Sequence, residues 1–360
     1  MALKYYFTPG PSELYFTVPD HIKNALNEKV GSISHRSSQF QGYFKHATKQ
    51  LRLLLNIPET HHIVFTNSAN EIWERLLQNC VKEHSLHFVN GAFSKKFHEF
   101  AIQLRKSPQK VEVPFGEGFT EKHLEIPENI EMVAVTQNET SAGVSFPLEY
   151  LPILRKNNPD ALITVDAVSS VPYPNFDFSG IDSLYFSVQK GMGLPAGLGV
   201  WILNNRCIEK ATQLENEGLS IGTYHSIPSL LKQAASFQTP ATPNVLGIYL
   251  LGKVAEDMNR RGAEVIRQET NYKAAFMYQA LENSPYFEPL VQEKQHRSKT
   301  VIVAKCLQKT PAEVLAYFAK KNMILGSGYG SYKSEQIRIA NFPTHSKESF
   351  LMLVDLIEGM

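Results

Sequence analysis

Short apolar runs alternate with stretches of helical periodicity along the first two thirds of the chain. Seven runs are short enough to be single strands: His62–Thr66, Leu86–Val89, Val111–Pro114, Met132–Thr136, Leu162–Val165, Leu184–Ser187 and Val200–Leu203. Helices are predicted between the first of them, at Asn70–Val81 and Ser94–Leu104. Because strands that alternate with helices usually form a parallel sheet covered on both faces, this pattern predicts an α/β fold.

The pattern changes after about residue 240, where Thr239–Pro243 forms a break. A long helical stretch, Asn244–Asn283, follows, and Gly262 is a candidate interruption within it. The remaining predicted elements are a strand at Thr300–Ala304, a helix at Pro311–Lys321, a strand at Gln336–Ala340 and a helix at Lys347–Ile357. This order predicts a smaller α+β domain in the last third of the chain.

The composition is that of a soluble globular protein, and together with the cysteines it predicts a cytoplasmic location. Of the 360 residues, 43% are hydrophobic and 20% charged, and a net charge of +1 gives no sign of a nucleic-acid or membrane partner. The three cysteines are far apart and form no C-x-x-C pair, which indicates reduced thiols and no cysteine-based metal site. No apolar run approaches membrane-spanning length, and the first residues lack the apolar stretch of a signal peptide.

Lys190 is the first candidate for chemistry. It follows the apolar run Ile181–Phe186 and precedes the glycine-rich stretch Gly191–Gly199, which allows close approach of the backbone. Most lysines are solvated surface residues, so the residue alone is weak evidence. A lysine held in a closed site, however, can lose its proton and attack a carbonyl group.

Asp166 ends the apolar run Ala161–Val165, one predicted strand before Lys190. An aspartate at this place commonly ends a strand or caps a turn. The functional interpretation is an ion pair with a protonated ring nitrogen. Pyridoxal phosphate requires a lysine for a Schiff base and an acidic partner for its pyridinium nitrogen, and the carboxyl ends of parallel strands meet at one edge. The two residues together therefore indicate a pyridoxal phosphate site.

Two further segments allow both a structural and a functional interpretation. Ser68 and Ala69 lie between a predicted strand and a predicted helix. They could cap the helix, or the free N–H groups there could bind a phosphate. Phe93 follows another strand, where it could be a core aromatic or could stack on a planar cofactor.

Candidate anion-binding residues lie at both ends of the chain. Arg338 lies within a strand-like run, either as a surface residue or as a bidentate clamp for a substrate carboxylate. His35 and Arg36 are adjacent and could hold an anion or form a salt bridge within a loop. His61 and His62 do not have the spacing of a helix-borne zinc pair, so no metal site is predicted. The glycine-rich nucleotide motifs GxGxxG and GxxxxGK[ST] are absent from the sequence.

Taken together, these residues resemble the fold-type I, class V aminotransferases, and within them the phosphoserine aminotransferase branch most of all. The resemblance is carried by Phe7–Ser12, Ile33–Ser37, Leu54–Pro58, Asn138–Thr140, Asp166–Ser170, Gln189–Lys190, Gln238–Pro240, Glu282–Ser284 and Ile337–Ile339. It implies a large pyridoxal phosphate domain over residues 15–243 with a mainly parallel seven-stranded sheet. Residues 1–14 and 244–360 would form the small domain, and a homodimer would have its active sites at the interface.

The resemblance also implies roles for individual residues. Lys190 would form the Schiff base and move the proton, and Asp166 would pair with the pyridine nitrogen. Thr140 would lie near the ring hydroxyl, and Phe93 would stack on the ring. The cofactor phosphate would be held by Ser68, Ala69, Gln189 and, from the other subunit, Gln238 and Thr239.

For the substrate, the resemblance implies that Arg338 clamps the carboxylate. His35 and Arg36 would receive a phosphate or a side-chain carboxylate across the dimer interface. The activity implied is ping-pong transamination between phosphoserine and 2-oxoglutarate, in serine biosynthesis. The sequence departs from the family at Asn67–Glu71, which replaces Gly-Gly-Gly-Arg-Gly, and at Phe93, which replaces a tryptophan. An alanine or serine–glyoxylate (pyruvate) aminotransferase and a non-catalytic protein on this fold therefore remain as alternatives.

Overall fold

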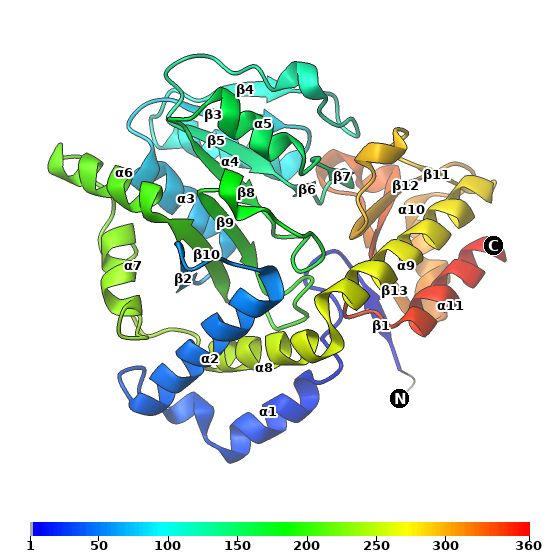
Figure 1. The fold of residues 1–360 in the computed structure, drawn as a ribbon. Coiled ribbons are helices and arrows are strands. Elements are labelled where there is room, and N and C mark those ends of the chain that lie inside the picture. Colours follow the sequence, from blue (N-terminus) through cyan, green and yellow to red (C-terminus); the bar gives the residue numbers. More distant parts are fainter. Residues whose placement is uncertain (1–2) are drawn as a thin grey trace.

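Two β-sheets organise the computed structural model, which describes residues 3–360 (Figure 1). The larger sheet has seven strands in the order β2-β10-β9-β8-β5-β3-β4. Their bounds are β2 (His61–Thr66), β3 (Ser85–Val89), β4 (Gln109–Glu112), β5 (Met132–Thr136), β8 (Leu162–Asp166), β9 (Ser183–Ser187) and β10 (Gly199–Asn204). The predicted α/β architecture and the seven-stranded sheet are thus confirmed.

Most neighbours in this sheet are parallel, and β10 is the exception. The pairs β3–β4, β3–β5, β5–β8 and β8–β9 are parallel, whereas β10 is antiparallel to both β2 and β9. The chain therefore reverses directly between β9 and β10, and Lys190 lies in that connection. The predicted strand Val111–Pro114 was placed two residues too late, because β4 is an edge strand with exposed polar residues that hydrophobicity does not mark.

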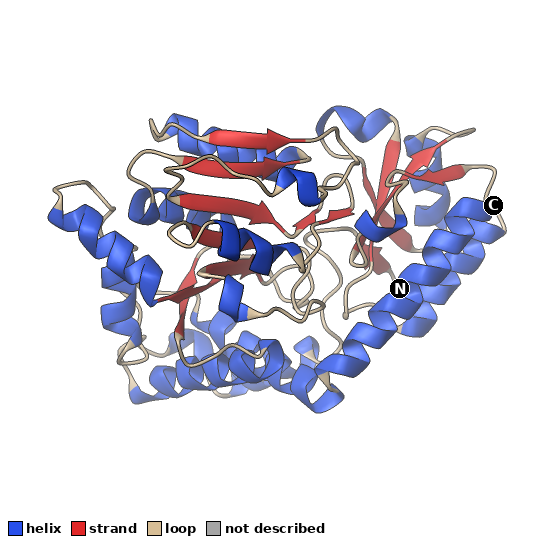
Figure 2. Cartoon of the chain, turned by 45° about the horizontal axis from the view of Figure 1, so that its top comes forward, coloured by secondary structure: helices blue, strands red, loops and turns tan. Residues whose placement is uncertain are grey.

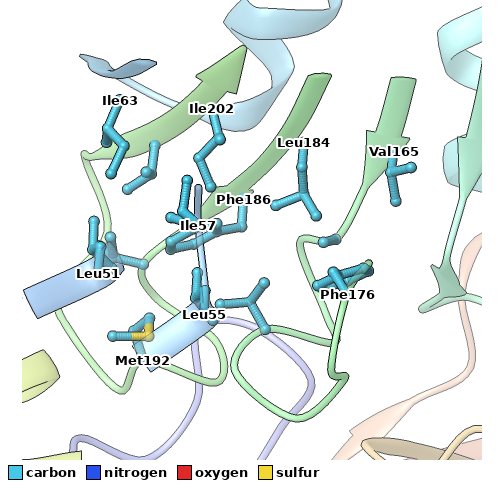
Figure 3. Packing of buried hydrophobic residues seen from close by; sticks show 14 of the residues in the cluster. Leu51, Leu55, Ile57, Ile63, Val165, Phe176, Leu184, Phe186, Met192 and Ile202 are labelled. Atoms are coloured by element: carbon cyan, nitrogen blue, oxygen red, sulfur yellow. The ribbon is translucent and has the colours of Figure 1, made fainter. Parts of the chain in front are cut away.

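Alternate residues of the central strands enter two different hydrophobic cores. Ile202 and Leu184 belong to one core, whereas Trp201 and Tyr185 belong to the other. The first core packs under α1 (Val18–Asn27), α2 (Ser38–Leu55), α5 (Tyr150–Asn157) and α8 (Val245–Arg261); Figure 3 shows part of it, with Leu51 and Leu55 of α2 against the strands. The second core packs under α3 (Ala69–Cys80), α4 (Ala92–Gln103), α6 (Asn205–Asn216) and α7 (Ile227–Ala234). Burial on both faces explains why these strands are nearly continuous apolar runs.

The second sheet has the order β1-β13-β14-β12-β11 and lies at the end of the molecule that carries both termini (Figure 1). Its strands are β1 (Tyr5–Phe7), β11 (Phe287–Pro289), β12 (Val301–Cys306), β13 (Met323–Ser327) and β14 (Gln336–Ala340). The helices packed with it are α9 (Ala263–Asn283), α10 (Pro311–Lys320) and α11 (Lys347–Glu358). The amino-terminal strand is added parallel to β13, with Tyr5 opposite Met323.

The remaining elements are short and connect these layers. A two-stranded ribbon is formed by β6 (Asn138–Glu139) and β7 (Val144–Ser145). Single 3-10 turns lie at η1 (Val30–Ser32), η2 (Glu121–His123), η3 (Phe178–Gly180), η4 (Lys294–His296) and η5 (Gly330–Ser334). Within residues 3–360, no helix is long and apolar enough to cross a membrane.

The long helical stretch after residue 243 breaks at Gly262, which has a positive φ of 93° between α8 and α9. The two helices bury different faces. Leu250 and Val254 of α8 belong to the core of the large sheet, whereas Ala274 and Met277 of α9 belong to the core of the second sheet. We therefore propose that the two domains divide at Gly262, so that α8 goes with residues 15–243. Of the amino-terminal residues expected in the small domain, residues 1 and 2 lie outside the described part of the chain.

Candidate active site

A cavity of about 190 Å³ lies between the two sheets. The strands of the large sheet other than β10 point toward the second sheet (Figure 2), so the cavity opens where β5, β8 and β9 end. It brings together six of the residues predicted from sequence: Phe93, Thr140, Asp166, Gln189, Lys190 and Arg338. It also includes Trp73, Asn138, Ser187 and Tyr329, for which no role was predicted.

Lys190 is buried in this cavity between polar and aromatic neighbours. Its Nζ donates a hydrogen bond to Thr140 Oγ1 at 3.1 Å and lies 5.2 Å from the centre of the Phe93 ring. Burial lowers the pKa of Lys190 and the nearby Arg338 lowers it further, whereas Asp166 acts in the opposite direction. Together these effects leave the pKa of Lys190 below its ordinary value, so a larger fraction of Lys190 is neutral than of an exposed lysine at the same pH.

Asp166 receives one hydrogen bond on each carboxylate oxygen. The backbone N–H of Val168 donates to Oδ1 at 3.0 Å, and the indole Nε1 of Trp73 donates to Oδ2 at 3.0 Å. Burial raises the pKa of Asp166, while the Val168 N–H, Lys190 and the Trp73 N–H lower it. A buried carboxylate beside a cavity with a flat aromatic wall and a lysine fits a protonated ring nitrogen. The residues present therefore suit pyridoxal phosphate.

The hydroxyl of Thr140 is fixed by Ser169. Thr140 Oγ1 donates to Ser169 Oγ at 2.8 Å, and the Asn138 side-chain amide donates to the same oxygen at 2.8 Å. Ser169 Oγ in turn donates to the backbone carbonyl of Asn138 at 2.9 Å. Because every hydrogen-bonding position of Ser169 Oγ is used, the Thr140 hydroxyl has one orientation toward Lys190.

Glu139 holds the start of helix α4, which carries Phe93. Its carboxylate accepts hydrogen bonds from Ser94 N at 2.9 Å and from Phe93 N at 3.4 Å, at the positive end of the helix. A β-carbon at Gly91 would lie 2.4 Å from Glu139 Cγ, so only glycine allows this approach. The centre of the Phe93 ring lies 5.2 Å from Lys190 Nζ and 4.9 Å from the centre of the Tyr329 ring.

Arg338 reaches the cavity from β14 of the second sheet. Its Nε donates to the Ser327 carbonyl at 2.8 Å, and its guanidinium lies over the Tyr329 ring at 5.4 Å. Burial lowers its pKa to about 10, so the group is still a cation near neutral pH. This geometry leaves guanidinium N–H groups free to hold a carboxylate.

The amino-terminal end of α3 lies at the other side of the same strand ends. Ser68 caps the helix by accepting from Glu71 N at 3.3 Å, and Ala69 N donates to Ser187 Oγ at 2.9 Å. Glu71 also holds the Asn67 N–H at 2.9 Å and pairs with His225. Ser68 and Ala69 are therefore beside the cavity, in a loop ordered by a carboxylate.

The other four predicted residues lie away from the Lys190 cavity, within the part of the chain that the structure describes. Arg36 donates to Gln238 Oε1 at 2.8 Å and to Gln233 Oε1 at 3.1 Å, so two of the four are in contact with each other. Thr239, next to Gln238, is buried and donates to the Ala241 carbonyl at 2.7 Å. Burial and the Arg36 charge lower the pKa of His35.

Trp73 and Tyr329 are the main residues that sequence reasoning missed. Trp73 is followed by Leu76 and Leu77 at helical spacing, which is also the pattern of an ordinary core aromatic. Tyr329 belongs to a loop between β13 and β14 and has no local signal. Their place in the site arises only when α3 and the second sheet are packed against the strand ends.

The comparisons with known proteins agree with this geometry. A family model described as aminotransferase class V matches residues 4–335. A solved structure of a phosphoserine aminotransferase from Cytophaga hutchinsonii is 50% identical, with a TM-score of 0.97 over 99% of this chain and 98% of that one. A phosphoserine aminotransferase from Rhodococcus opacus (strain B4) is 25% identical over 357 residues, which cover 98% of this chain and 94% of the relative.

An aspartate aminotransferase of subgroup IV from Thermus thermophilus shares the fold, with a TM-score of 0.86 at 21% identity over 99% of this chain and 98% of that one. The chain belongs to the class-V aminotransferase family. Its predicted fold class, its transaminase activity and its use of pyridoxal phosphate are confirmed. Its substrates are accordingly amino acids and 2-oxo acids.

Proposed function

We propose that this aminotransferase transfers the amino group of phosphoserine to 2-oxoglutarate, in serine biosynthesis. The observation that carries the proposal is the 50% identical structure named as a phosphoserine aminotransferase, together with a cavity that holds Lys190, Asp166 and Arg338. The relative from Rhodococcus opacus with the same name supports it at lower identity. The intact pair of Lys190 and Asp166 argues against a non-catalytic protein on this fold.

Lys190 is the proposed base and acid of the reaction. When pyridoxal phosphate is bound, its ring acts as an electron sink for the charge left at the substrate α-carbon. The buried Lys190 amine accepts the α-proton, because its ammonium form is disfavoured relative to that of an exposed lysine. The Thr140 hydroxyl, 3.1 Å away, positions the amine for this transfer.

The other cavity residues bind and orient. Asp166 would keep the ring nitrogen protonated through an ion pair, and Phe93 would cover one face of the ring. Ser68, Ala69 and Gln189 would hold the cofactor phosphate near the amino-terminal end of α3. Arg338 would grip the α-carboxylate of either substrate with two parallel hydrogen bonds, which fixes the α-proton toward Lys190.

A homodimer is the proposed assembly, with each chain completing the site of its partner. The exposed Arg36, the half-buried His35 and the neighbouring pair Gln238 and Thr239 form one cluster away from the cavity. In a second copy, this cluster would supply cations for the substrate phosphate and donors for the cofactor phosphate. Beside it lies an apolar groove that includes Leu53 and Phe237, which suits an interface. Location in the cytoplasm fits free thiols at all three cysteines.

An alanine- or serine–glyoxylate (pyruvate) aminotransferase is the second candidate. The segment Asn67–Glu71 contains no arginine, and Glu71 brings a carboxylate to it, which disfavours an additional anion there. If the cations of the partner chain did not reach the substrate, the site would suit an amino acid with a small uncharged side chain better than one that carries a phosphate.

Half-reactions with single amino acids test the choice. Purified protein loaded with pyridoxal phosphate is mixed separately with phosphoserine, serine, alanine and glutamate, and the loss of the visible cofactor absorbance is followed. We expect phosphoserine and glutamate to react fastest, with Arg36→Ala slowing phosphoserine and leaving alanine little changed. Equal or faster conversion by alanine or serine would exclude the phosphoserine assignment.

A further inference from the structure

Trp73 contacts the carboxylate that is proposed to face the cofactor ring nitrogen. The residue lies on α3, is 2% exposed, and its indole N–H donates to Asp166 Oδ2 at 3.0 Å. The indole is itself held in place, because it stacks on Phe97 at 5.4 Å and 14° and meets the edge of Phe100 at 5.7 Å. The donor is therefore delivered to Asp166 by a fixed ring rather than by a mobile side chain.

The chemistry of the carboxylate gives this donor a function. Each oxygen of an ionised carboxylate can accept two hydrogen bonds, so the bonds from Val168 N and Trp73 Nε1 leave one position free on each oxygen. Two donors on different oxygens fix the plane of the carboxylate. They also favour its ionised form, which burial alone disfavours. Only the indole donor belongs to a side chain and can be removed by substitution.

We propose that Trp73 is a positioning residue for transamination, whose N–H group orients Asp166 and keeps it ionised for the protonated ring nitrogen of pyridoxal phosphate. The proposal rests on the proposed role of Asp166 and is independent of which amino acid is the substrate. If Trp73 only packed in the core, an aromatic ring without the N–H group would serve as well. Removal of the N–H group alone therefore distinguishes a packing role from the positioning of Asp166.

The chain offers a matched control, because it has two tryptophans. Trp201 on β10 belongs to the same hydrophobic core, is 0% exposed, and donates its indole N–H to Ser183 Oγ at 2.8 Å. Trp201→Phe therefore removes the same atoms and one buried hydrogen bond without touching Asp166. Any general cost of replacing a buried tryptophan is shared by Trp73→Phe and Trp201→Phe.

The first measurement is the affinity of the cofactor-free variants for pyridoxal phosphate as a function of pH. Loss of a hydrogen bond to a charged group predicts a Kd about tenfold or more higher in Trp73→Phe, and a change of less than about twofold in Trp201→Phe. Without its indole donor Asp166 takes up a proton at higher pH, so the acid limb of the affinity profile moves to higher pH. Equal affinities and profiles in the two variants would overturn the proposal.

The second measurement asks whether Trp73 acts through Asp166. In an Asp166→Asn background, we expect Trp73→Phe to change the Kd by less than about twofold, since coupled residues are not additive. If the two substitutions instead raise the Kd by independent factors that multiply in the double variant, the proposal is wrong. The failure of Asp166→Asn to weaken binding would instead reject the role of Asp166 itself.

A third measurement leaves Trp73 intact and does not depend on the folding of its variant. In Trp201→Phe the only indole N–H resonance belongs to Trp73, because the chain has two tryptophans. We expect this resonance to move when Asp166→Asn is added and when pyridoxal phosphate binds. A resonance that Asp166→Asn leaves in place would contradict the hydrogen bond on which the proposal depends.

Discussion

The backbone of Gly10 lies directly against the side chain of Lys190. A β-carbon at Gly10 would be 2.7 Å from Lys190 Cε and 3.1 Å from its Cγ, and Gly10 has a positive φ of 140°. The same segment is tied to the lysine loop, since Ser12 N donates to the Gln189 carbonyl at 3.1 Å. The amino-terminal Gly-Pro segment therefore forms one wall around the lysine.

Gly10→Ala should displace the lysine and lower kcat. The methyl group cannot fit unless Lys190 moves, and a misplaced reacting group costs on the order of 10²-fold in rate. Gly218 also has a positive φ, of 80°, but a β-carbon added there would meet nothing within 4 Å. Gly218→Ala therefore carries the backbone strain without the contact, and steady-state kinetics should show wild-type kcat. Equal losses in both variants would mean that strain alone is responsible.

Lys190→Ala should remove the covalent link to the cofactor and the base. Positioned proton transfer contributes about 10²–10⁴-fold, so kcat should fall at least that far. The purified wild type should be yellow, and the colour should vanish after dialysis of Lys190→Ala. A wild-type protein without colour or cofactor would argue against the catalytic role of Lys190.

Glu139→Gln should loosen the start of helix α4 and weaken the hold on Phe93. Ser94 N and Phe93 N donate to different oxygens of Glu139, and the carboxamide replaces one of these oxygens with an NH2 donor. One of the two backbone N–H groups then loses its acceptor, and a buried unsatisfied donor costs about 1–3 kcal/mol. Urea unfolding and cofactor circular dichroism measure the two effects. Glu313→Gln is the control, because Glu313 caps the solvent-exposed start of α10 by accepting from Thr310 N at 2.8 Å. We expect a smaller loss of stability there and an unchanged cofactor signal.

The pH dependence of cofactor capture should report the charges around Lys190. Capture requires the neutral amine, so its rate rises with pH through the pKa of Lys190, which lies below the ordinary value because of burial and Arg338. Arg338→Met removes a cation, raises that pKa and should move the profile to higher pH. Asp166→Asn removes an anion, lowers the pKa and should move the profile to lower pH. Stopped-flow absorbance measures the capture rate at each pH. If the pH profiles of Arg338→Met and Asp166→Asn move in the same direction, the electrostatic explanation is wrong.

Arg36→Ala and Lys190→Ala should complement each other if the active site is shared across a dimer. Each homodimer would be impaired with phosphoserine. Random exchange of equal amounts gives half heterodimers with one intact site, hence about a quarter of wild-type activity. Mixing Lys190→Ala with Lys190→Arg is the control, because both lesions fall at the same position. No gain over the separate variants would place Arg36 in its own chain's site or outside the site.

The sequence determined the strands of the large sheet, the interrupted long helix and the candidate chemistry of Lys190, Asp166 and Arg338. In the second sheet it indicated only β12 and β14, and it missed β1, β11 and β13. The central strands were found because burial on both faces makes them apolar throughout, and Gly262 broke the helix where a positive φ was required. The edge strand β4 was misplaced because its residues are exposed and polar. Hydrophobic patterns and helix-breaking glycines depend only on a few consecutive residues, so they can be recognised in the sequence.

Tertiary structure alone decided which of these residues meet. Trp73 has the sequence pattern of a core aromatic, and only the packing of α3 brings its N–H to within 3.0 Å of Asp166 Oδ2. Tyr329 lies in the loop between β13 and β14 of the second sheet and contacts Phe93, at the start of α4 beside the large sheet. Packing likewise joined Arg36 to Gln238, over 200 residues later in the chain. Such contacts depend on distances between elements far apart in the sequence, which no local periodicity encodes.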